Sequence, residues 1–486
     1  MGKKIAVIGS GFASLSASCY LARDGYQVTV YEKNEQLGGR ASRLTRDGFT
    51  FDMGPSWYWM PDIFEKFFGD FGKAPSDYYE LDRLDPAYQI FFKDEAVTIG
   101  GSLDQICAEF ERIEPGSSVP LRRFMDRAAD NYRIAIEKMV YKPGLSPLEL
   151  VSPDTVLRLG RFFSTISRDI RKEFKNPKLV SILEFPVLFL GAKPSDTPSF
   201  YSFMNYADFG LGTWHPRGGM YRIVEGMVEL ARSLGVTFKT DAPVTGIAVK
   251  DGKATGVLTK EGEEPADLVL SGADYHHTET LLPETYRQFP EKYWEARTFA
   301  PSSLLFFVGF DRKLQGVRHH NLFFDTDFEQ HAREIYDRPQ WPEDPLFYAN
   351  FPSVTDPGMA PEGSETGFFL MPLAPGLEDR PELREMYFNR LIDRLEQRTG
   401  QQVRSSIRFS ESFCVRDFVE RYNSYKGNAY GMANTLRQTA FLRPGLKSRK
   451  VESLYFAGQL TVPGPGVPPS LISGKLASEL ILKNHS

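Results

Sequence analysis

The stretch "KKIAVIGSGFASLSASCYLARDGYQVTVYEK" at residues 3–33 decides the fold class of this chain. Residues 5–8 form a short apolar run rich in β-branched side chains, which is typical of a buried parallel strand. A glycine-rich turn follows, then a helical pattern over 12–23 and a second strand pattern over 27–31. This order of strand, turn, helix and strand predicts an α/β fold with a Rossmann-type dinucleotide-binding domain.

The turn "GSGFAS" supplies the groups that hold a pyrophosphate in such a domain. Gly9 permits the tight turn, Gly11 lets the backbone approach the ligand, and the free N–H groups at Phe12 and Ala13 open the helix. Ser14 stands where a third glycine or an alanine is usual, and a serine is only one oxygen larger than an alanine. We therefore expect the motif to be weakened but kept. The alternative is a glycine-rich turn that binds no ligand.

Glu32, at the end of the second strand, is placed to accept hydrogen bonds from a ribose hydroxyl group. An acid at this position disfavours a ribose that carries a 2′-phosphate, so an NADP-type ligand is not expected. Lys33 follows directly and is included in the predicted cofactor-binding set.

The bulk composition indicates a globular protein of more than one domain. The chain has 486 residues, of which 41% are hydrophobic and 25% charged. Its net charge of −5 offers no basic footprint, so nucleic acid is not an expected partner. The three cysteines lie far apart without metal-ligand spacing, and no apolar run is long enough to span a bilayer. The N-terminus runs directly into a strand, which argues against a secretory signal and for a cytoplasmic location.

A second glycine pair, Gly38 and Gly39, precedes Arg40 shortly after the ribose acid. The glycines let the backbone crowd a second phosphate, and Arg40 adds a fixed positive charge; its alternative role is a surface salt bridge. A nicotinamide enzyme does not need this second clamp. Here the sequence resembles the FAD-dependent amine-oxidase and carotenoid-desaturase superfamily, which implies FAD as the cofactor.

The same resemblance implies two further contacts to the cofactor. The element "FDMGPSW" places Gly54, Pro55 and Ser56 close to the flavin. In the resembling families the backbone of a valine at the position of Val244 contacts the adenine.

The tail "LYFAGQLTVPGPGVPPSLISGKLASELIL" predicts a strand over 454–456 and a helix from about Pro469. The resemblance implies that Gly458 lies against the ribityl and phosphate groups, and that Val467 and Pro468 contact the flavin through their backbone. Many relatives carry aspartate after the glycine, whereas this chain has Gln459, which is retained in the predicted set without a defined side-chain contact.

Domain boundaries follow from the placement of these motifs. We predict a discontinuous FAD-binding domain formed by residues 1–75, 215–280 and 440–486. Residues 76–214 and 281–439 are predicted to form an interleaved α+β domain that binds the substrate and contacts a membrane.

Over most of its length the chain resembles the bacterial-type carotenoid (phytoene) desaturases. The segment "TWHPRGGMYRIVEGM" carries this resemblance together with the N-terminal and tail motifs, and the tail favours the branch that desaturates 1-hydroxycarotenoids at C-3,4. The resemblance implies that one carbon of a long polyene loses a hydride to flavin N5 while its neighbour loses a proton, with oxygen or a quinone as the final electron acceptor.

Two residues are candidates for the proton acceptor. Asp208 lies shortly before Trp214, where related desaturases also carry an acid, and His215 follows that tryptophan. In a dry cleft either side chain could have a pKa suited to proton removal. The alternative for each is a capping or hydrogen-bonding role.

The substrate domain is predicted to enclose an apolar tunnel and to touch a membrane surface. Aromatic residues are 13% of the chain and cluster in stretches such as "LEFPVLFLGAKPSDTPSFYSF" and "PSSLLFFVGF", although each can equally be ordinary core. Residues 156–175 show apolar side chains at helical spacing opposite basic ones, a pattern of helices that lie on anionic membranes. A helix docked on its own domain explains that pattern equally well.

Several other functions fit parts of the sequence. They are a phytoene desaturase, a flavin-dependent carotenoid isomerase, an amine oxidase, and a non-catalytic isoprenoid-binding protein on the same fold. An amine oxidase often links its flavin covalently, but no cysteine or histidine stands beside the tail motif.

Overall fold

A parallel five-stranded sheet forms the centre of the first half of the protein. The computed structural model describes residues 2–146, 149, 164–435 and 437–485. Among these residues the sheet order is β19-β13-β1-β2-β9, with every neighbouring pair parallel. Its strands are β1 (Lys4–Ile8), β2 (Gln27–Tyr31), β9 (Thr237–Lys239), β13 (Leu268–Ser271) and β19 (Leu454–Phe456). Three distant parts of the chain therefore share one sheet.

The predicted elements around the glycine-rich turn are confirmed. Helix α1 (Phe12–Arg23) has the predicted bounds, and β1 begins one residue earlier than expected. The last helix, α16 (Val467–His485), begins two residues before the predicted start, and α10 (Tyr221–Ser233) covers one face of α1.

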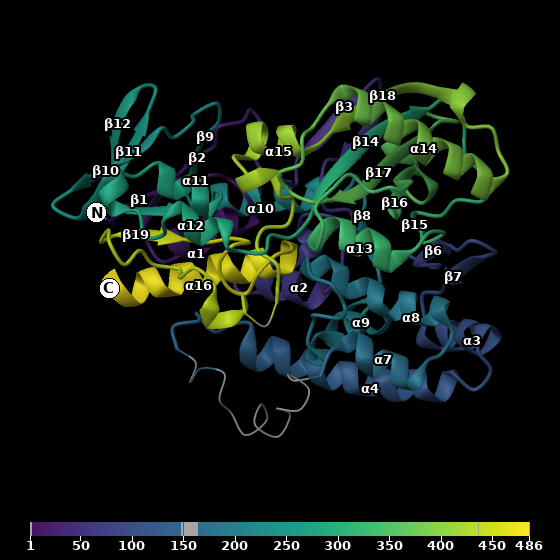
Figure 1. The fold of residues 1–486 in the computed structure, drawn as a ribbon. Helices are drawn as coiled ribbons and strands as arrows, with labels where there is room; N and C mark the ends of the chain where they lie inside the picture. The colour runs from purple at the N-terminus through teal and green to yellow at the C-terminus, as the bar shows by residue number, and fades with distance from the viewer. Residues whose placement is uncertain (1, 147–148, 150–163, 436, 486) are drawn as a thin grey trace.

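Helices α1 and α16 pack against each other at very short range. A Cβ atom on Gly474 of α16 would lie 2.3 Å from the carbonyl oxygen of Ala13, so only glycine permits this approach. The Ser16 hydroxyl donates to the Leu471 carbonyl oxygen across the same interface, at 2.7 Å. Figure 1 shows both chain ends beside the parallel sheet.

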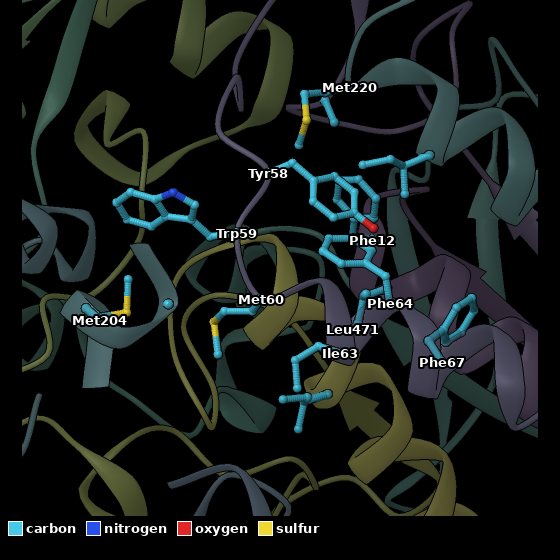
Figure 2. Close-up of a cluster of buried hydrophobic side chains, with 14 of the residues drawn as sticks. Phe12, Tyr58, Trp59, Met60, Ile63, Phe64, Phe67, Met204, Met220 and Leu471 are labelled. Carbon is cyan, nitrogen blue, oxygen red and sulfur yellow. The ribbon is translucent and has the colours of Figure 1, made fainter. Parts of the chain in front are cut away.

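Helix α2 (Pro61–Gly69) extends this packing into the main apolar core. Phe64 of α2, Phe12 of α1 and Leu471 of α16 belong to one buried cluster, part of which is drawn in Figure 2. The stretch that leads into α2 carries Trp59 and Met60, which belong to the same cluster. This core joins the half that contains the parallel sheet to the rest of the protein.

A mixed seven-stranded sheet dominates the second half. Its order among the described residues is β18-β14-β17-β16-β15-β6-β7, and only the β15–β6 pair is parallel. The strands are β6 (Tyr88–Phe91), β7 (Ala96–Ile99), β14 (Ser302–Phe310), β15 (His320–Phe323), β16 (Phe347–Asn350), β17 (Glu365–Leu373) and β18 (Ile407–Phe413).

The two faces of this sheet have different neighbours because side chains alternate along a strand. On β14, Leu304 and Phe306 join a separate core cluster with residues of α14 (Pro381–Thr399). The intervening residues of the strand, Leu305 and Phe307, face the main core. The first face is closed by α14, while the second is available to a binding site.

A helical layer lies beside the seven-stranded sheet, and Figure 1 shows α3, α4, α7 and α8 grouped together there. The remaining α-helices of four residues or more and the strands of the small sheets complete the fold. These elements are α3 (Leu103–Ile113), α4 (Ser118–Ile134), α7 (Ile166–Glu173), α8 (Pro177–Glu184), α11 (Tyr275–Thr280), α12 (Glu291–Glu295), α13 (Phe328–Tyr336), α15 (Val415–Tyr422), β3 (Arg43–Arg46), β4 (Phe49–Asp52), β5 (Leu81–Arg83), β8 (Trp214–Pro216), β10 (Gly246–Lys250), β11 (Lys253–Thr259) and β12 (Gly262–Pro265).

The predicted amphipathic helix over 156–175 differs from what the structure describes. Residues 156–163 lie outside the described residues, and α7 begins only at Ile166, after the Thr165 cap. Ile166, Ile170 and Phe174 are all buried within the protein. For this part of the pattern, docking on its own domain is correct and a membrane-facing apolar side is not.

Candidate active site

One large cavity joins the parallel sheet to the seven-stranded sheet. It has a volume of about 1000 Å³ and runs from the glycine-rich turn to β16, β17 and α13. Every residue predicted to contact the cofactor lines it. These residues are Gly9, Gly11, Phe12, Ala13, Glu32, Lys33, Gly39, Arg40, Gly54, Pro55, Ser56, Val244, Gly458, Gln459, Val467 and Pro468.

The glycine-rich turn presents open backbone to the cavity. A Cβ atom added to Gly11 would meet no protein atom within 4 Å, so the space in front of this residue is free for a ligand. The turn tolerates Ser14 because a glycine lies opposite: a Cβ atom on Gly272 would lie 2.0 Å from the Ser14 hydroxyl oxygen. The third small position of the motif is thus shared between Ser14 and Gly272.

The Glu32 carboxylate holds two segments together at the predicted ribose position, the glycine-rich turn and the residues that follow β2. One carboxylate oxygen accepts from the backbone N–H and the hydroxyl of Ser10, at 3.0 and 2.6 Å. The other accepts from the backbone and side-chain N–H groups of Asn34, both at 2.9 Å. The buried carboxylate is therefore fixed at the end of β2, where a ribose hydroxyl could reach it.

Arg40 lies half-buried in the wall of the cavity. Its guanidinium donates to the Ser424 hydroxyl at 2.5 Å and faces the Gln459 side-chain oxygen at 3.0 Å in the amide orientation that satisfies both groups. Burial lowers the pKa of Arg40, and the Asp274 carboxylate opposes that change. The Arg40 Nε–H has no partner among the described residues, so the wall keeps a charged donor available for an anionic ligand.

Residues around Lys33 form the rim of the cavity at the end that contains Glu32 and Arg40. The Lys33 ammonium donates to the Glu420 carbonyl oxygen at 2.6 Å and to the Asn423 side chain at 3.1 Å. Val244 lines the cavity opposite, half-buried after β9. Residues of α15 and the turn after it close the rim, so a long ligand would lie in a covered trough.

The tail places a second glycine and a helix start at the cavity. Gly458 has φ +110°, which favours glycine, and its N–H donates to the Ser473 hydroxyl at 2.9 Å. Val467 and Pro468 open the 19-residue helix α16 on the cavity wall. The positive end of that helix dipole therefore faces the cavity. These features, with the open face at Gly11 and the unpaired Arg40 N–H, fit an anionic dinucleotide such as FAD.

Beyond the motif residues the cavity wall becomes largely apolar. The aromatic stretches named from the sequence supply many of its side chains. The aromatic residues on this part of the wall include Trp57, Trp59, Phe185, Phe200, Tyr201, Phe203, Phe324, Phe328, Tyr336, Phe347, Tyr348, Tyr430 and Phe441. Such a wall can hold a long apolar chain and keep water from it.

Asp208 and His215 lie behind the wall and do not line the cavity. The Asp208 carboxylate accepts from the Tyr88 hydroxyl at 2.7 Å, and burial raises its pKa to about 7. His215 Nε2 lies 3.1 Å from the Asp356 carboxylate. Both side chains have protein partners, as the hydrogen-bonding alternative predicts, and neither is brought next to the cofactor residues.

Sequence reasoning missed several polar groups on or near the wall. The Tyr348 hydroxyl lies 3.1 Å from the Ser56 hydroxyl and 2.6 Å from His320 Nδ1. The His320 ring stacks on Trp57 at 4.0 Å between centroids. Asp274 could have been found, because it follows strand 268–271 at the carboxyl edge of a parallel sheet. Nothing local marks Tyr348 or His320, since their meeting with Ser56 depends on the pairing of distant strands.

Comparisons with known proteins identify the family of this chain. The model of the family described as flavin containing amine oxidoreductase matches residues 12–482. The chain is 43% identical to a carotenoid 3,4-desaturase of Haloarcula japonica over 99% of both proteins. It is 32% identical to a zeta-carotene-forming phytoene desaturase of Myxococcus xanthus, covering 99% of this chain and 94% of that one.

A solved structure supports the fold alone. A protein described as a putative protoporphyrinogen oxidase from Exiguobacterium superposes with a TM-score of 0.63 over the whole of both chains, at 15% identity. The family expected from the sequence is confirmed, and the chain belongs to the flavin-containing amine oxidoreductases, in the branch of the carotenoid desaturases.

Proposed function

We propose that this protein is an FAD-dependent desaturase that introduces the C3=C4 double bond into a 1-hydroxycarotenoid. The observation that carries the proposal is the single cavity in which every predicted cofactor residue meets a long apolar wall. The 43% identity to a carotenoid 3,4-desaturase supports the choice of bond. A carotenoid isomerase or a non-catalytic isoprenoid-binding protein is less favoured, because the relatives named above are desaturases and the flavin-binding motifs are complete.

Residues from three segments would hold the cofactor. Glu32 would bind the adenine ribose, the N-terminus of α1 at Gly11 would bind the pyrophosphate, and Arg40 would add a positive charge. FAD, when bound, supplies the hydride acceptor. We assign residues 1–75, 215–280 and 440–486 to cofactor binding, and 76–214 and 281–439 to the substrate and the membrane.

The apolar wall would position the polyene and exclude water. Both effects matter because the hydride must leave a carbon held in contact with the acceptor, and water would disturb that alignment. Oxygen or a quinone would then accept the electrons.

Asp208 and His215 would act on the reaction through other residues. Asp208 binds Tyr88, whose ring contacts Trp57 edge-to-face at 5.4 Å, and Trp57 lines the cavity. His215 is bound by Asp356, which also accepts from the Gly218 N–H at 2.6 Å. We therefore assign both residues to positioning the wall rather than to direct contact with the substrate.

Membrane contact would occur at the end of the cavity near residues 135–146 and 439–441. No helix in the described ranges has both the length and the apolar character that a membrane crossing requires. Leu145 is 60% exposed, and Phe441 and Leu442 are also exposed, beside wall residues such as Met139. A carotenoid could pass from a bilayer into the cavity here, so we propose a peripheral protein on the cytoplasmic membrane surface.

Replacing Gly11 should weaken FAD binding without a large change in the stability of the apoprotein. In Gly11→Ala the added methyl group meets no protein atom, and the backbone φ of −66° suits alanine, so the free energy of unfolding of the apoprotein should change by less than about 1 kcal/mol. The same methyl group points at the pyrophosphate position, so the Kd for FAD, measured by flavin fluorescence, should rise at least about tenfold. Gly69→Ala, which also meets no atom but lies away from the cavity, is the control. An unchanged Kd in Gly11→Ala would contradict the proposed pyrophosphate site.

Product mass should distinguish desaturation from isomerisation. Purified protein with FAD, given 1-hydroxylated or acyclic carotenes in liposomes, should form products lighter by two hydrogen atoms, detected by mass spectrometry. The reaction should fail without added FAD. Products of unchanged mass, formed while flavin is bound, would identify an isomerase instead.

Asp208→Asn should change the pH dependence of stability more than it changes turnover. The raised pKa means that the folded state binds this proton more tightly than the unfolded state, so the wild type loses stability as pH rises from about 4 through 7. Asparagine does not ionise, so this loss should be absent in the variant when unfolding is followed by urea titration across that range. Desaturation at saturating substrate should fall less than about tenfold. A loss of several orders of magnitude, with normal folding, would return Asp208 to the role of proton acceptor.

Charge at the exposed end of the cavity should weaken membrane binding. Leu145→Asp should reduce the fraction of protein that floats with phosphatidylglycerol vesicles in a density gradient, because the new carboxylate opposes apolar insertion and anionic lipid. Val119→Asp is a matched control, since Val119 is 62% exposed at the opposite end of α4. Equal flotation of the two variants and the wild type would place the membrane-contacting surface elsewhere.

A further inference from the structure

One strand of the seven-stranded sheet places a hydroxyl group on the apolar wall of the cavity. Ser303 lies on β14, whose cavity-facing positions alternate with those that face α14. The next residue on the same face, Leu305, lines the cavity, and Leu370 and Pro372 of the neighbouring strand β17 do so as well. Ser303 is therefore a polar group within an apolar face.

The Ser303 hydroxyl is buried, and its polar contact within the described part of the chain is with the Tyr430 side chain. The residue is 1% exposed, and its oxygen makes no hydrogen bond of good geometry. A buried hydroxyl without a good hydrogen bond destabilises a protein. A bound ligand or a water molecule could supply the missing hydrogen bond. Ser302, the preceding residue, shows the usual solution, since its hydroxyl donates to the Gly427 carbonyl oxygen at 2.6 Å.

Tyr430 lines the cavity beside Ser303. The segment that carries Tyr430 runs beside the start of β14, because the Ala429 N–H donates to the Pro301 carbonyl oxygen at 3.0 Å and the Ala300 N–H donates to the Gly431 carbonyl oxygen at 2.8 Å. Burial raises the pKa of Tyr430 to about 12, and a contact with the Ser303 hydroxyl opposes that rise. Tyr348 is close enough to feel the charge of an ionised Tyr430, but its hydroxyl already contacts Ser56 and His320. Ser303 and Tyr430, with Tyr336 further along the same cavity, are thus hydroxyl groups whose capacity is not used by regular hydrogen bonds within the described protein.

This hydroxyl pair lies at the cofactor end of the apolar wall. Tyr348, its neighbour, contacts Ser56, which belongs to the motif expected beside the flavin. Tyr430 also belongs to a loop that reaches the tail motif, since a Cβ atom on Gly431 would lie 2.8 Å from the Gln459 side chain. A polar group of the substrate held here would be near the carbon atoms that react.

A hydrocarbon polyene offers no hydrogen-bonding group to Ser303 or Tyr430. In a 1-hydroxycarotenoid, the carbon that carries the hydroxyl is separated from the C3–C4 bond by a single methylene carbon, so its oxygen must lie close to the reacting carbons. We propose that Ser303 and Tyr430 bind the hydroxyl group of the substrate and so select oxygenated carotenoids and set which bond meets the flavin. This inference rests on the proposed function and names the residues that give it specificity.

The test compares two substrates that differ only in the hydroxyl group. For the wild-type holoenzyme, kcat/KM for a 1-hydroxylated acyclic carotene should exceed that for the same carotene without the hydroxyl, because the buried pair would otherwise stay unpaired. In Ser303→Ala and in Tyr430→Phe the ratio of the two kcat/KM values should fall roughly tenfold, the loss expected for one hydrogen bond. Ser303→Thr keeps the hydroxyl and should restore much of the ratio.

The control removes a similar hydroxyl from another place. Ser18 on α1 is also buried with an unpartnered hydroxyl but lies away from the cavity, so Ser18→Ala should leave the ratio unchanged. Flavin absorbance and thermal unfolding of each variant establish that the protein is folded and loaded. If Ser303→Ala does not fold, Tyr430→Phe carries the same comparison.

The outcomes separate this inference from the proposed function. If the wild type desaturates both carotenes with equal efficiency, or if the variants lower both values by the same factor, the hydroxyl subsite is wrong while desaturation stands. If the flavin-loaded wild type forms no desaturated product from either carotene, the proposed function itself fails. A ratio that falls in both variants and not in Ser18→Ala supports the subsite.

Discussion

The close approach of α16 to α1 determines where the whole site can form. At Gly474 the two backbones are so near that a single methyl group would overlap the Ala13 carbonyl oxygen. This contact brings Gly458 and the start of α16 to the same cavity as Gly11, although the two glycines are more than four hundred residues apart in the chain. Both chain ends line the cavity, so the proposed cofactor site would exist only when the last segment of the chain has docked on the first.

The division of the cavity into a polar and an apolar part follows from the two sheets that border it. The carboxyl edge of the parallel sheet ends in turns whose free backbone groups and charged side chains face the cavity. The antiparallel strands β14 and β17 of the second sheet offer the cavity one face of alternating side chains, which are mostly apolar. The cavity therefore suits a charged ligand at one end and an apolar ligand along the other, and the proposed function would place the reacting atoms where the two parts meet.

The sequence was most informative where function depends on local backbone geometry. Gly9, Gly11, Glu32 and the Gly39–Arg40 pair follow one another at fixed short distances, so their motif predicted the fold and selected residues that line one cavity. Ser14 looked like a defect because its partner, Gly272, is far away in the chain, and only the packing of α1 against the segment after β13 shows why a serine fits.

The sequence was less informative where the role of a residue depends on its neighbours in the folded protein. Asp208 was selected by its distance along the chain from Trp214, but its side chain turns to Tyr88 behind the wall. The helix expected at 156–175 was weighed as a membrane helix on its amphipathic pattern, yet the described part buries Ile166 and Ile170 against the protein, since an amphipathic pattern does not say what covers the apolar side. Ser303 has no local signal, because a serine in an apolar strand becomes notable only once its face is known.

Arg443 explains how a loop can hold Tyr430 rigidly beside the cofactor end. Its buried guanidinium donates to the Met432 carbonyl oxygen at 2.8 Å and to the Gln459 carbonyl oxygen at 3.1 Å, which joins the loop after Tyr430 to the tail motif. Burial lowers the pKa of Arg443 to about 10, so it stays charged at neutral pH, and backbone carbonyl groups stabilise that charge. Because a buried charge that loses its partners is strongly destabilising, the loop and the tail are held to one relative position. Any group that binds next to Tyr430 is thereby placed at a fixed distance from the residues proposed to surround the flavin, which is what selection of a single bond in a long uniform polyene requires.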